Sequence, residues 1–193
     1  MQGSNWTETY RKGYHAIQFY SSDQERLQAI HDILGWMGEG DVLVYFTIQP
    51  DQGFLDSLES AISDRISKAI SSGRLVVRDS YSFYCPNGEF DGSDRAKSWL
   101  QLMDHFKDLG YDELVVVGDL SWAARDHELL DEIIKYEAKV TMNGLPSGMT
   151  AVCQYDTRLL DEMDIDCISS VHEFQIDNDG LKRNYWLISN HHN

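Results

Sequence analysis

The sequence lacks long apolar runs and has little positive charge. Its 193 residues include 16 Lys and Arg against 32 Asp and Glu, which gives a formal net charge of -16. A field of this sign repels phosphate backbones and anionic lipid surfaces, so we expect no direct binding of nucleic acid. No apolar stretch approaches the roughly 20 residues needed to span a bilayer, and the N-terminus has no apolar signal core. These absences predict a cytoplasmic protein without a membrane segment.

Cysteine and metal-binding motifs are also scarce. The three cysteines, Cys85, Cys153 and Cys167, form no CxxC pair and are too few for a disulfide framework, which favours a reducing compartment. The seven histidines show no HxxxH or HExxH spacing. Residues 177–180 resemble the start of a calcium loop, but the closing glutamate is absent and a hairpin turn is the better interpretation. We expect neither a metal ion nor a cofactor.

A phosphate-binding loop is missing as well. Neither GxxxxGK[ST] nor GxGxxG occurs, and the segment that follows DVLVYF is TIQPDQGF, which contains no lysine. Nucleotide phosphates need backbone N–H groups and a lysine to neutralise them. Nucleotide binding is therefore an alternative interpretation and not the first one.

What the sequence does contain is an alternation of strand and helix patterns. Apolar and β-branched runs predict strands at residues 15–20, 41–47, 75–79, 113–118 and 148–156. Apolar residues at helical spacing predict helices at 22–37, 54–72, 93–110 and 127–141, with a short one around 157–164. Two alternating runs, 170–176 and 184–189, flank the turn 178–180 and predict an antiparallel hairpin.

This alternation predicts an α/β fold of three layers. Strands joined through helices need right-handed crossovers, which gives a mostly parallel sheet with helices on both faces. The C-terminal antiparallel hairpin is expected to extend one edge of that sheet. We expect a polar N-terminal leader over residues 1–13 and a single domain over residues 14–190.

Aromatic residues gather where a ligand would bind. In open α/β sheets ligands bind beyond the carboxyl ends of the strands. Residues 80–92 are predicted to form a long loop there, with Ser93 capping the next helix. The aromatics in this loop or at strand ends are Tyr81, Phe83, Tyr84, Phe90, Trp122 and Tyr155. They could form a mostly apolar pocket, or they could cover the sheet edge and bind nothing.

Two carboxylates occupy unusual positions. Asp119 follows a buried strand, where it could bind magnesium as in a P-loop enzyme or could serve only as a turn former. Glu137 lies on the apolar stripe of its helix, four residues after Ile133 and three before Val140. A carboxylate brought toward a core needs a specific partner. For Glu137 a structural hydrogen bond to backbone N–H groups or to a tyrosine is favoured over a role as catalytic base.

The remaining candidates have structural alternatives. Cys153 precedes Gln154, Tyr155 and Asp156 at a strand end, but no cationic neighbour is evident to lower its pKa, so core packing is favoured. Asp156 could cap the helix that follows. His15 opens the first strand and His172 opens the hairpin; each is a possible site group or a structural histidine.

Several segments together point to a known family. They occur in order between residues 14 and 175 and are HAIQFYSSDQE, NGEFDGSDRAKSW, VVGDLSWA, IIKYEAKV and AVCQYD. Together they resemble the MEDS family, the sensory domain named after methanogens and methylotrophs. The resemblance implies a RecA-like fold, similar to the circadian-clock ATPases but without their Walker A loop. It further implies a module that senses small hydrocarbon derivatives, often attached to helix-turn-helix, histidine kinase or PAS partners.

The resemblance also carries residues with it. Those that match the family's motifs are His15, Tyr20, Asp119, Trp122, Tyr136, Glu137, Cys153, Gln154, Tyr155 and Asp156. The family commonly has a glutamate where this chain has Asp119. It often has Thr-His-Pro around the position of His172, where this chain has Val-His-Glu.

Together these expectations describe a non-catalytic sensory domain for a small, weakly polar molecule. Asp119, Gln154 and Asp156 would orient the ligand at the carboxyl ends of the strands. Trp122, Tyr155 and the loop 80–92 would enclose it, and Glu137 would hold the neighbouring helix in register. The expected ligand-binding residues are His15, Tyr20, Tyr84, Asp119, Trp122, Glu137, Gln154, Tyr155 and Asp156.

Two other classes of function stay open. One is a degenerate nucleotide-binding protein or hydrolase that uses Asp119. The other is a protein–protein interaction module whose crevice is filled by its own aromatics and whose acidic surface binds a basic partner. For the sensory domain, a kinase, a transcription regulator or a second copy of the chain would receive the signal.

Overall fold

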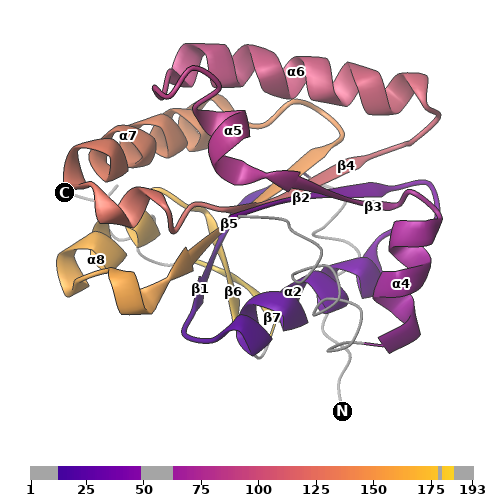
Figure 1. Ribbon diagram of the computed structural model, residues 1–193, viewed down its shortest axis with the longest axis horizontal. Coiled ribbons are helices and arrows are strands. Elements are labelled where there is room, and N and C mark those ends of the chain that lie inside the picture. The colour runs from indigo at the N-terminus through magenta and orange to yellow at the C-terminus, as the bar shows by residue number, and fades with distance from the viewer. Residues whose placement is uncertain (1–12, 49–62, 178–179, 185–193) are drawn as a thin grey trace.

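The fold is a seven-stranded sheet between two layers of helices (Figure 1). The computed structural model describes residues 13–48, 63–177 and 180–184. Its strands are β1 (His15–Tyr20), β2 (Val42–Thr47), β3 (Leu75–Asp79), β4 (Leu114–Asp119), β5 (Met149–Asp156), β6 (Phe174–Asp177) and β7 (Gly180–Arg183). They lie in the order β3-β2-β4-β5-β1-β6-β7, and every neighbouring pair is parallel except β6 and β7. The predicted α/β class with a C-terminal hairpin at one edge is confirmed.

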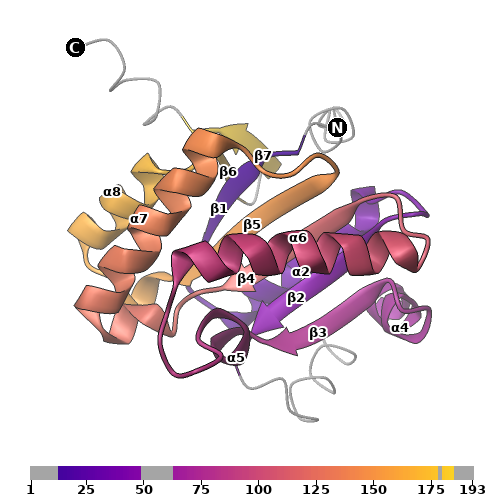
Figure 2. The ribbon, with the colours of Figure 1, turned by 90° about the horizontal axis from the view of Figure 1, so that it is seen from above.

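Helices cover both faces of the sheet. They are α2 (Asp23–Trp36), α4 (Ser63–Ser71), α5 (Ser80–Tyr84), α6 (Gly92–Asp108), α7 (His127–Asn143) and α8 (Glu162–Ser170). Helices α6 and α7 lie on one face, and α2 and α4 lie on the other (Figures 1 and 2). Among the residues the structure describes, no helix is long and apolar enough to cross a bilayer.

Strand β2 shows why the central strands are continuously apolar. All six of its residues are buried. Val44 and Phe46 pack into the cluster under α6 and α7, whereas Leu43 and Tyr45 pack into the cluster with α2 and α4. Successive side chains of a strand point to opposite faces, so a strand covered by helices on both sides needs apolar residues at every position.

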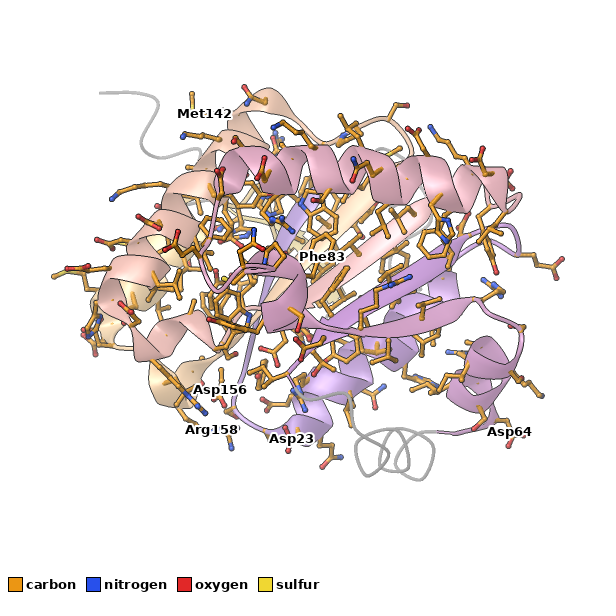
Figure 3. The ribbon with its side chains drawn as sticks, turned by 45° about the horizontal axis from the view of Figure 1, so that its top comes forward. Asp23, Asp64, Phe83, Met142, Asp156 and Arg158 are labelled. Atoms are coloured by element: carbon orange, nitrogen blue, oxygen red, sulfur yellow. The ribbon has the colours of Figure 1, made fainter. Side chains whose placement is uncertain are left out.

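The aromatic segment 80–92 is not the uninterrupted loop that we expected. Its first five residues form helix α5, because the side chain of Asp79 accepts a hydrogen bond from the backbone N–H of Ser82 and caps the turn. Phe83 of α5 lies between the sheet and α6, with its ring centroid 4.3 Å from that of Phe46 and 4.6 Å from that of Trp99 (Figure 3). Burial of these rings stabilises a helix that local sequence alone would not.

Two helix starts also differ from the prediction. The cap of α6 is Asp91, whose carboxylate accepts hydrogen bonds from the backbone N–H groups of Ser93 and Asp94. The expected cap, Ser93, instead lies in the first turn. The short helix expected around 157–164 is a 3-10 turn, Thr157–Leu159, followed by α8, which a capping box between Asp161 and Asp164 begins.

The second strand of the hairpin begins earlier than the apolar runs indicated. Strand β6 begins at Phe174, and β7 begins directly at Gly180, which pairs with Asp177. A two-residue connection places its flanking residues opposite each other, so pairing starts at the turn and not at the apolar run near residue 184. The expected leader apart from Gly13, the turn residues 178–179 and residues 185–189 lie outside the described residues. So does the first part of the helix predicted at 54–72.

The corrected cap of α6 gives the first prediction. Asp91→Ala should lower the free energy of unfolding by about 1 kcal/mol, because the first turn of α6 loses the acceptor for its N–H groups. Ser93→Ala should cost only a few tenths of a kcal/mol. Urea denaturation followed by circular dichroism measures both, and a larger loss for Ser93→Ala than for Asp91→Ala would contradict this assignment.

Candidate functional site

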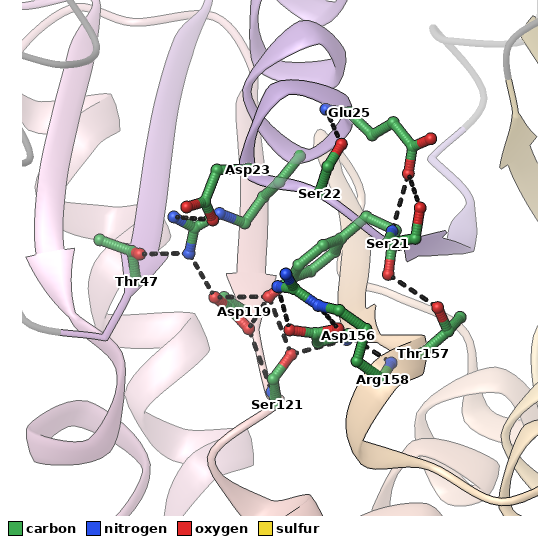
Figure 4. A network of polar contacts seen from close by, with 12 residues as sticks. Ser21, Ser22, Asp23, Glu25, Thr47, Asp119, Ser121, Asp156, Thr157 and Arg158 are labelled. Carbon is green, nitrogen blue, oxygen red and sulfur yellow. Dashed lines mark hydrogen bonds and ion pairs between the residues drawn. The ribbon is translucent and has the colours of Figure 1, made fainter.

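The carboxyl ends of the parallel strands bring several predicted site residues together. In the strand register Tyr20 is opposite Asp156, and Asp119 is opposite Gln154. Figure 4 shows Asp119, Ser121 and Asp156 within one network of polar contacts at this edge. The structure therefore brings these predicted residues together at the sheet edge, whereas their contact with a ligand stays a prediction.

A buried ion pair lies at the centre of this network. The carboxylate Oδ2 of Asp119 accepts a hydrogen bond from the guanidinium Nη1 of Arg26 at 2.8 Å, and the Asp119 side chain is fully buried. The Tyr20 hydroxyl lies 3.3 Å from the same oxygen, and the backbone N–H of Ser121 donates to Oδ1. Asp119 is thus held by groups of the chain itself.

The other edge residues are held in the same way. Asp156 forms a salt bridge with Arg158 at 2.6 Å, and the hydrogen bond from Arg158 lowers the pKa of the Asp156 carboxyl. The amide nitrogen of Gln154 donates to the side chain of Gln18 and to the backbone carbonyl of Arg26. Asp156 also caps the 3-10 turn that follows it, as expected.

Trp122 takes part in the packing of this edge. Its indole N–H donates to the hydroxyl of Ser80 at 3.0 Å, and that hydroxyl in turn donates to the backbone carbonyl of Asp119. The ring of Trp122 also lies against Tyr81 and Tyr84. The side chains at this edge thus contact one another across α2, α5, β4 and β5.

Arg26 is a residue that sequence analysis missed. It lies on α2 four residues before Ile30 and seven before Ile33, both of which are buried. The helical stripe that identified Glu137 as a buried acid therefore also identifies Arg26 as a largely buried base, whose side chain is 12% exposed. Applied to both helices, the same criterion would have found it.

A second polar cluster lies on the other face of the sheet. It contains His15 of β1, Glu137 of α7, Cys153 of β5 and His172, which precedes β6, and all four side chains are buried. One potential ligand atom from each lies within 4.8 Å of the others. Strands β1 and β5 are hydrogen-bonded neighbours in which His15 and Cys153 lie two residues apart in register, which places both side chains on the same face.

Glu137 has the partner that its buried position requires. The hydroxyl of Tyr155 donates to its Oε2 at 3.0 Å. This confirms the structural hydrogen bond to a tyrosine that the sequence favoured. Among the residues that the structure describes, neither the second carboxylate oxygen of Glu137, Oε1, nor Nε2 of His172 has a hydrogen-bond partner, and both atoms are buried.

Burial sets the protonation states of this cluster. It raises the pKa of Glu137 from 4.5 to about 7, and the hydrogen bonds from Cys153 and Tyr155 offset part of that shift. It lowers the pKa of His172 to about 4 and that of His15 well below 6.5. Nε2 of His172 lies 3.9 Å from Oε2 of Glu137. The two side chains do not form an ion pair at neutral pH, because the imidazole is uncharged.

The four donors are types that bind metal ions. Imidazole, thiolate and carboxylate are the ligands of zinc sites. We expected no metal because the histidines show no helical ligand spacing, yet here each donor comes from a different segment. Cys153 and His172, both given structural interpretations, prove to be central members of the cluster.

A surface groove lies above this cluster, between α6 and α7. Its volume is about 700 Å³. The lining includes Phe90, Gly92, Trp99, Leu100, Tyr136, Lys139, Val140, Leu145 and Pro146. A smaller cavity of about 30 Å³ is lined by His15, Tyr84, Glu137 and Cys153, among others.

The groove and the small cavity share four residues. These are Trp99, Tyr136, Val140 and Leu145. The indole N–H of Trp99 donates to the hydroxyl of Tyr136 at 2.6 Å, which joins α6 to α7. Gly92, at the start of α6, approaches Tyr136 so closely that a Cβ atom at this position would lie 2.9 Å from the ring. The shared side chains thus separate the groove from the polar cluster.

The structure therefore divides the predicted ligand-binding residues between two places. Tyr20, Asp119, Trp122, Gln154 and Asp156 belong to the network at the carboxyl edge. His15, Tyr84, Glu137 and Tyr155 belong to the buried cluster and its cavity. Strand β5 supplies both, because its successive side chains point to opposite faces.

Comparison with known proteins identifies the family. A family model described as MEDS, MEthanogen/methylotroph, DcmR Sensory domain, matches residues 14–173. The chain belongs to the MEDS family. The resemblance stated from its sequence segments is confirmed, and the buried cluster, from His15 to His172, lies inside the matched region. No curated protein matches this MEDS chain.

Solved structures show the fold of this MEDS domain. An uncharacterized protein from Pyrococcus horikoshii, solved in complex with an unknown peptide, matches with a TM-score of 0.57 and 13% identity over 88% of this chain and 81% of that one. A KaiC-like protein from Pyrococcus horikoshii OT3 matches with a TM-score of 0.54 and 13% identity over 89% and 76%. At such low identity the likeness concerns the fold alone, which is RecA-like.

The buried ion pair of the carboxyl edge gives a stability prediction. Asp119→Ala should lower the free energy of unfolding by about 3 kcal/mol, because the guanidinium of Arg26 stays buried without its main counter-ion. Lys97→Ala is the control. It removes an exposed ion pair with Asp94 and should change stability by less than about 0.5 kcal/mol. If the two variants lost similar amounts of unfolding free energy, the buried ion pair would stabilise the fold no more than the exposed one.

Glu137 gives a prediction for pH dependence. Because its pKa is raised in the folded protein, its favourable contribution is fully present below about pH 4.5 and is lost as pH rises through about 7. Glu137→Gln is neutral at every pH. With a chelator present, the stability of this variant relative to the unmodified protein should therefore increase by up to about 3 kcal/mol between about pH 5 and pH 8. A difference that stays constant over this range would contradict the raised pKa.

Proposed function

We propose that this MEDS chain is a non-catalytic sensory domain that binds a small, weakly polar molecule in the groove between α6 and α7. The observation that carries the proposal is that this surface groove lies directly over a second, smaller cavity. An outer volume of about 700 Å³ lies over an inner cavity of about 30 Å³, and the two share Trp99, Tyr136, Val140 and Leu145.

The size and lining of the groove support this proposal. Small-molecule sites usually have volumes of roughly 300–1,000 Å³, with apolar and aromatic walls and a few polar groups. Here the aromatic rings of Phe90, Trp99 and Tyr136 meet the aliphatic side chains of Val140 and Leu145. Glu132, Lys135 and Lys139 add charged groups to the lining, where they could orient a polar end of the ligand.

The contact between Trp99 and Tyr136 supports a sensing role. Their hydrogen bond connects α6 to α7, and both rings line the groove and the inner cavity. A ligand that inserts between the two rings would break this hydrogen bond and change the position of α6 relative to α7. A sensor requires no more than a ligand with different contacts in two such states.

The carboxyl edge is the weaker candidate for the ligand. Its polar side chains are already bonded to one another, and Asp119 is engaged by Arg26 at 2.8 Å. A carboxylate held in this way is not free to bind magnesium, which weighs against a nucleotide hydrolase. Titration with ATP and magnesium tests that alternative, and binding tighter than about 100 μM would revive it.

The signal of a sensory domain needs a receiver. We propose that a protein partner, such as a kinase or a transcription regulator, or a second copy of the chain responds to the ligand-bound state. The net charge of -16 favours a partner with a basic surface.

The groove is tested with a matched pair of variants on one helix. Leu100 lines the groove and is 53% exposed, whereas Leu109 caps the end of α6 away from the groove and is 61% exposed. In a thermal-shift screen of halogenated and methylated one-carbon compounds, a ligand at 100 times its Kd should raise the Tm by about 5 °C. Leu100→Glu should abolish that shift, and Leu109→Glu should preserve it.

The outcome also locates the site. If a ligand is found and Leu100→Glu leaves its binding unchanged, the groove is not the site. If Trp122→Phe, at the carboxyl edge, abolishes binding while Trp99→Phe does not, the ligand binds at that edge instead. A screen that yields no ligand, together with ATP binding tighter than about 100 μM, would contradict the proposed function.

A further inference from the structure

The buried cluster of His15, Glu137, Cys153 and His172 has more acceptors than donors. The ring nitrogen Nδ1 of His172 lies 2.8 Å from the backbone carbonyl of Ile168. A carbonyl only accepts hydrogen bonds, so Nδ1 carries the proton of this neutral imidazole. Its Nε2 therefore has a lone pair, and this buried atom has no hydrogen-bond partner within the described part of the chain.

Thr141 fixes the proton of His15 in the same way. The Thr141 hydroxyl donates to the backbone carbonyl of Val171 at 2.5 Å, so its oxygen must accept from Nδ1 of His15, at 2.8 Å. The lone pair of His15 is then on Nε2, which lies 3.2 Å from the sulfur of Cys153. Both imidazoles thus turn an unprotonated Nε2 toward one small volume, with ring centroids 4.3 Å apart.

The hydrogen atoms available in this volume do not satisfy its acceptors. When Glu137 is ionised, four acceptor atoms converge there: the two Nε2 atoms, the sulfur of Cys153 and a carboxylate oxygen of Glu137. The thiol proton can serve only one of its neighbours. Oε2 of Glu137 already accepts from Tyr155, which leaves Oε1 as a buried oxygen without a partner. Buried polar atoms of this kind are rare in folded proteins unless a further group binds them.

We propose that His15, Glu137, Cys153 and His172 together bind one transition-metal ion of the zinc type. Two neutral imidazoles, one thiolate and one carboxylate balance the charge of a divalent cation, so the filled site is neutral in the protein interior. The mixture of nitrogen, sulfur and oxygen donors suits zinc, whereas calcium and magnesium prefer oxygen ligands alone. This inference goes beyond the proposed binding of a small molecule and does not depend on it.

The distances fit a tetrahedral site after a small contraction. Zinc lies about 2.0–2.3 Å from such ligands, so tetrahedral ligand atoms are roughly 3.3–3.8 Å apart. The four donors lie within 4.8 Å of one another, and two of their separations are 3.2 Å, for His15 and Cys153, and 3.9 Å, for His172 and Glu137. Side-chain rotations that shorten the longest of these separations by about 1 Å would close the site.

The surroundings of the cluster match those of metal sites. A histidine that binds a metal usually donates its other ring N–H to a backbone carbonyl or another fixed acceptor, which orients the ring. His172 does so through Ile168, and His15 does so through Thr141 and Val171. The cavity of about 30 Å³ reaches three of the four donors, His15, Glu137 and Cys153, and provides room for an ion to approach.

The test uses the purified full chain after treatment with a chelator. Titration with Co²⁺ should give one ion per chain, with the strong visible absorption of tetrahedral cobalt and a near-ultraviolet band from thiolate-to-cobalt charge transfer. Zn²⁺ should then displace Co²⁺ and remove both bands. Absence of the charge-transfer band, or uptake without saturation at one ion per chain, would overturn the proposal.

Variants assign the ligands. Cys153→Ser should remove the charge-transfer band and weaken Co²⁺ binding by more than 100-fold, while Cys85→Ser and Cys167→Ser should leave both unchanged. His172→Gln and Glu137→Gln should each weaken binding, and His31→Gln, at a partly exposed histidine outside the cluster, is their control. If Cys153→Ser does not fold, the two Gln variants and the spectrum of the unmodified protein still decide. Binding that Cys153→Ser leaves unchanged would assign the ion to surface carboxylates and overturn the proposal.

Thr141→Val tests the orienting hydrogen bond. The variant keeps the shape of the side chain but removes the oxygen that accepts from His15. Loss of such a partner typically weakens metal binding 10- to 100-fold. The visible bands of the Co²⁺ complex should also shift, which a purely structural role of Thr141 would not cause. An unchanged spectrum and affinity would rule out Thr141 as a positioning residue.

These measurements are distinct from the test of the groove. Leu100→Glu should bind Co²⁺ as the unmodified chain does, because Leu100 lines the groove and not the cluster. Metal binding without any one-carbon ligand would support the metal site alone. The reverse result would support the groove alone.

Discussion

The burial of polar side chains on strand β5, away from water, is the constraint on which the rest of this structure depends. Every residue of the strand except one is buried, yet Gln154 and Cys153 each need polar neighbours. Because their side chains point to opposite faces, the chain must supply partners both from α2 and from α7. Two polar groups follow from this requirement, one on each side of the sheet. They are the Arg26–Asp119 pair and the histidine–cysteine–glutamate cluster.

This division separates a densely hydrogen-bonded part of the domain from one with fewer polar contacts. At the carboxyl edge, charged hydrogen bonds and a buried ion pair connect β1, β4, β5 and α2, and most of the polar atoms named there are satisfied. Between α6 and α7, one hydrogen bond joins two aromatic rings above a small cavity, and buried acceptor atoms lie below. An unpaired buried polar group is costly, and a ligand that binds only the folded state stabilises it.

Much of the fold could be predicted from the sequence, because alternation along strands and periodicity along helices are local signals. The burial of Glu137 could be inferred from its helical stripe, and Arg26 was detectable in the same way. Helix α5 could not be predicted from the sequence, because its stability comes from aromatic rings that pack against β2 and α6. The cluster was hidden for a different reason. His15 is 126 residues from Thr141 and 138 from Cys153, so no spacing motif brings them together and only the strand order does.

Gly92 has a consequence for how the groove could transmit a change. With no side chain between the first turn of α6 and the ring of Tyr136, the helix backbone rests directly on that ring. A rotation of the Tyr136 ring would therefore press directly on the backbone at the start of this 17-residue helix. If α6 moved as one rigid body, a small movement of that ring in the interior would displace the far end of the helix, near Leu109, at the molecular surface.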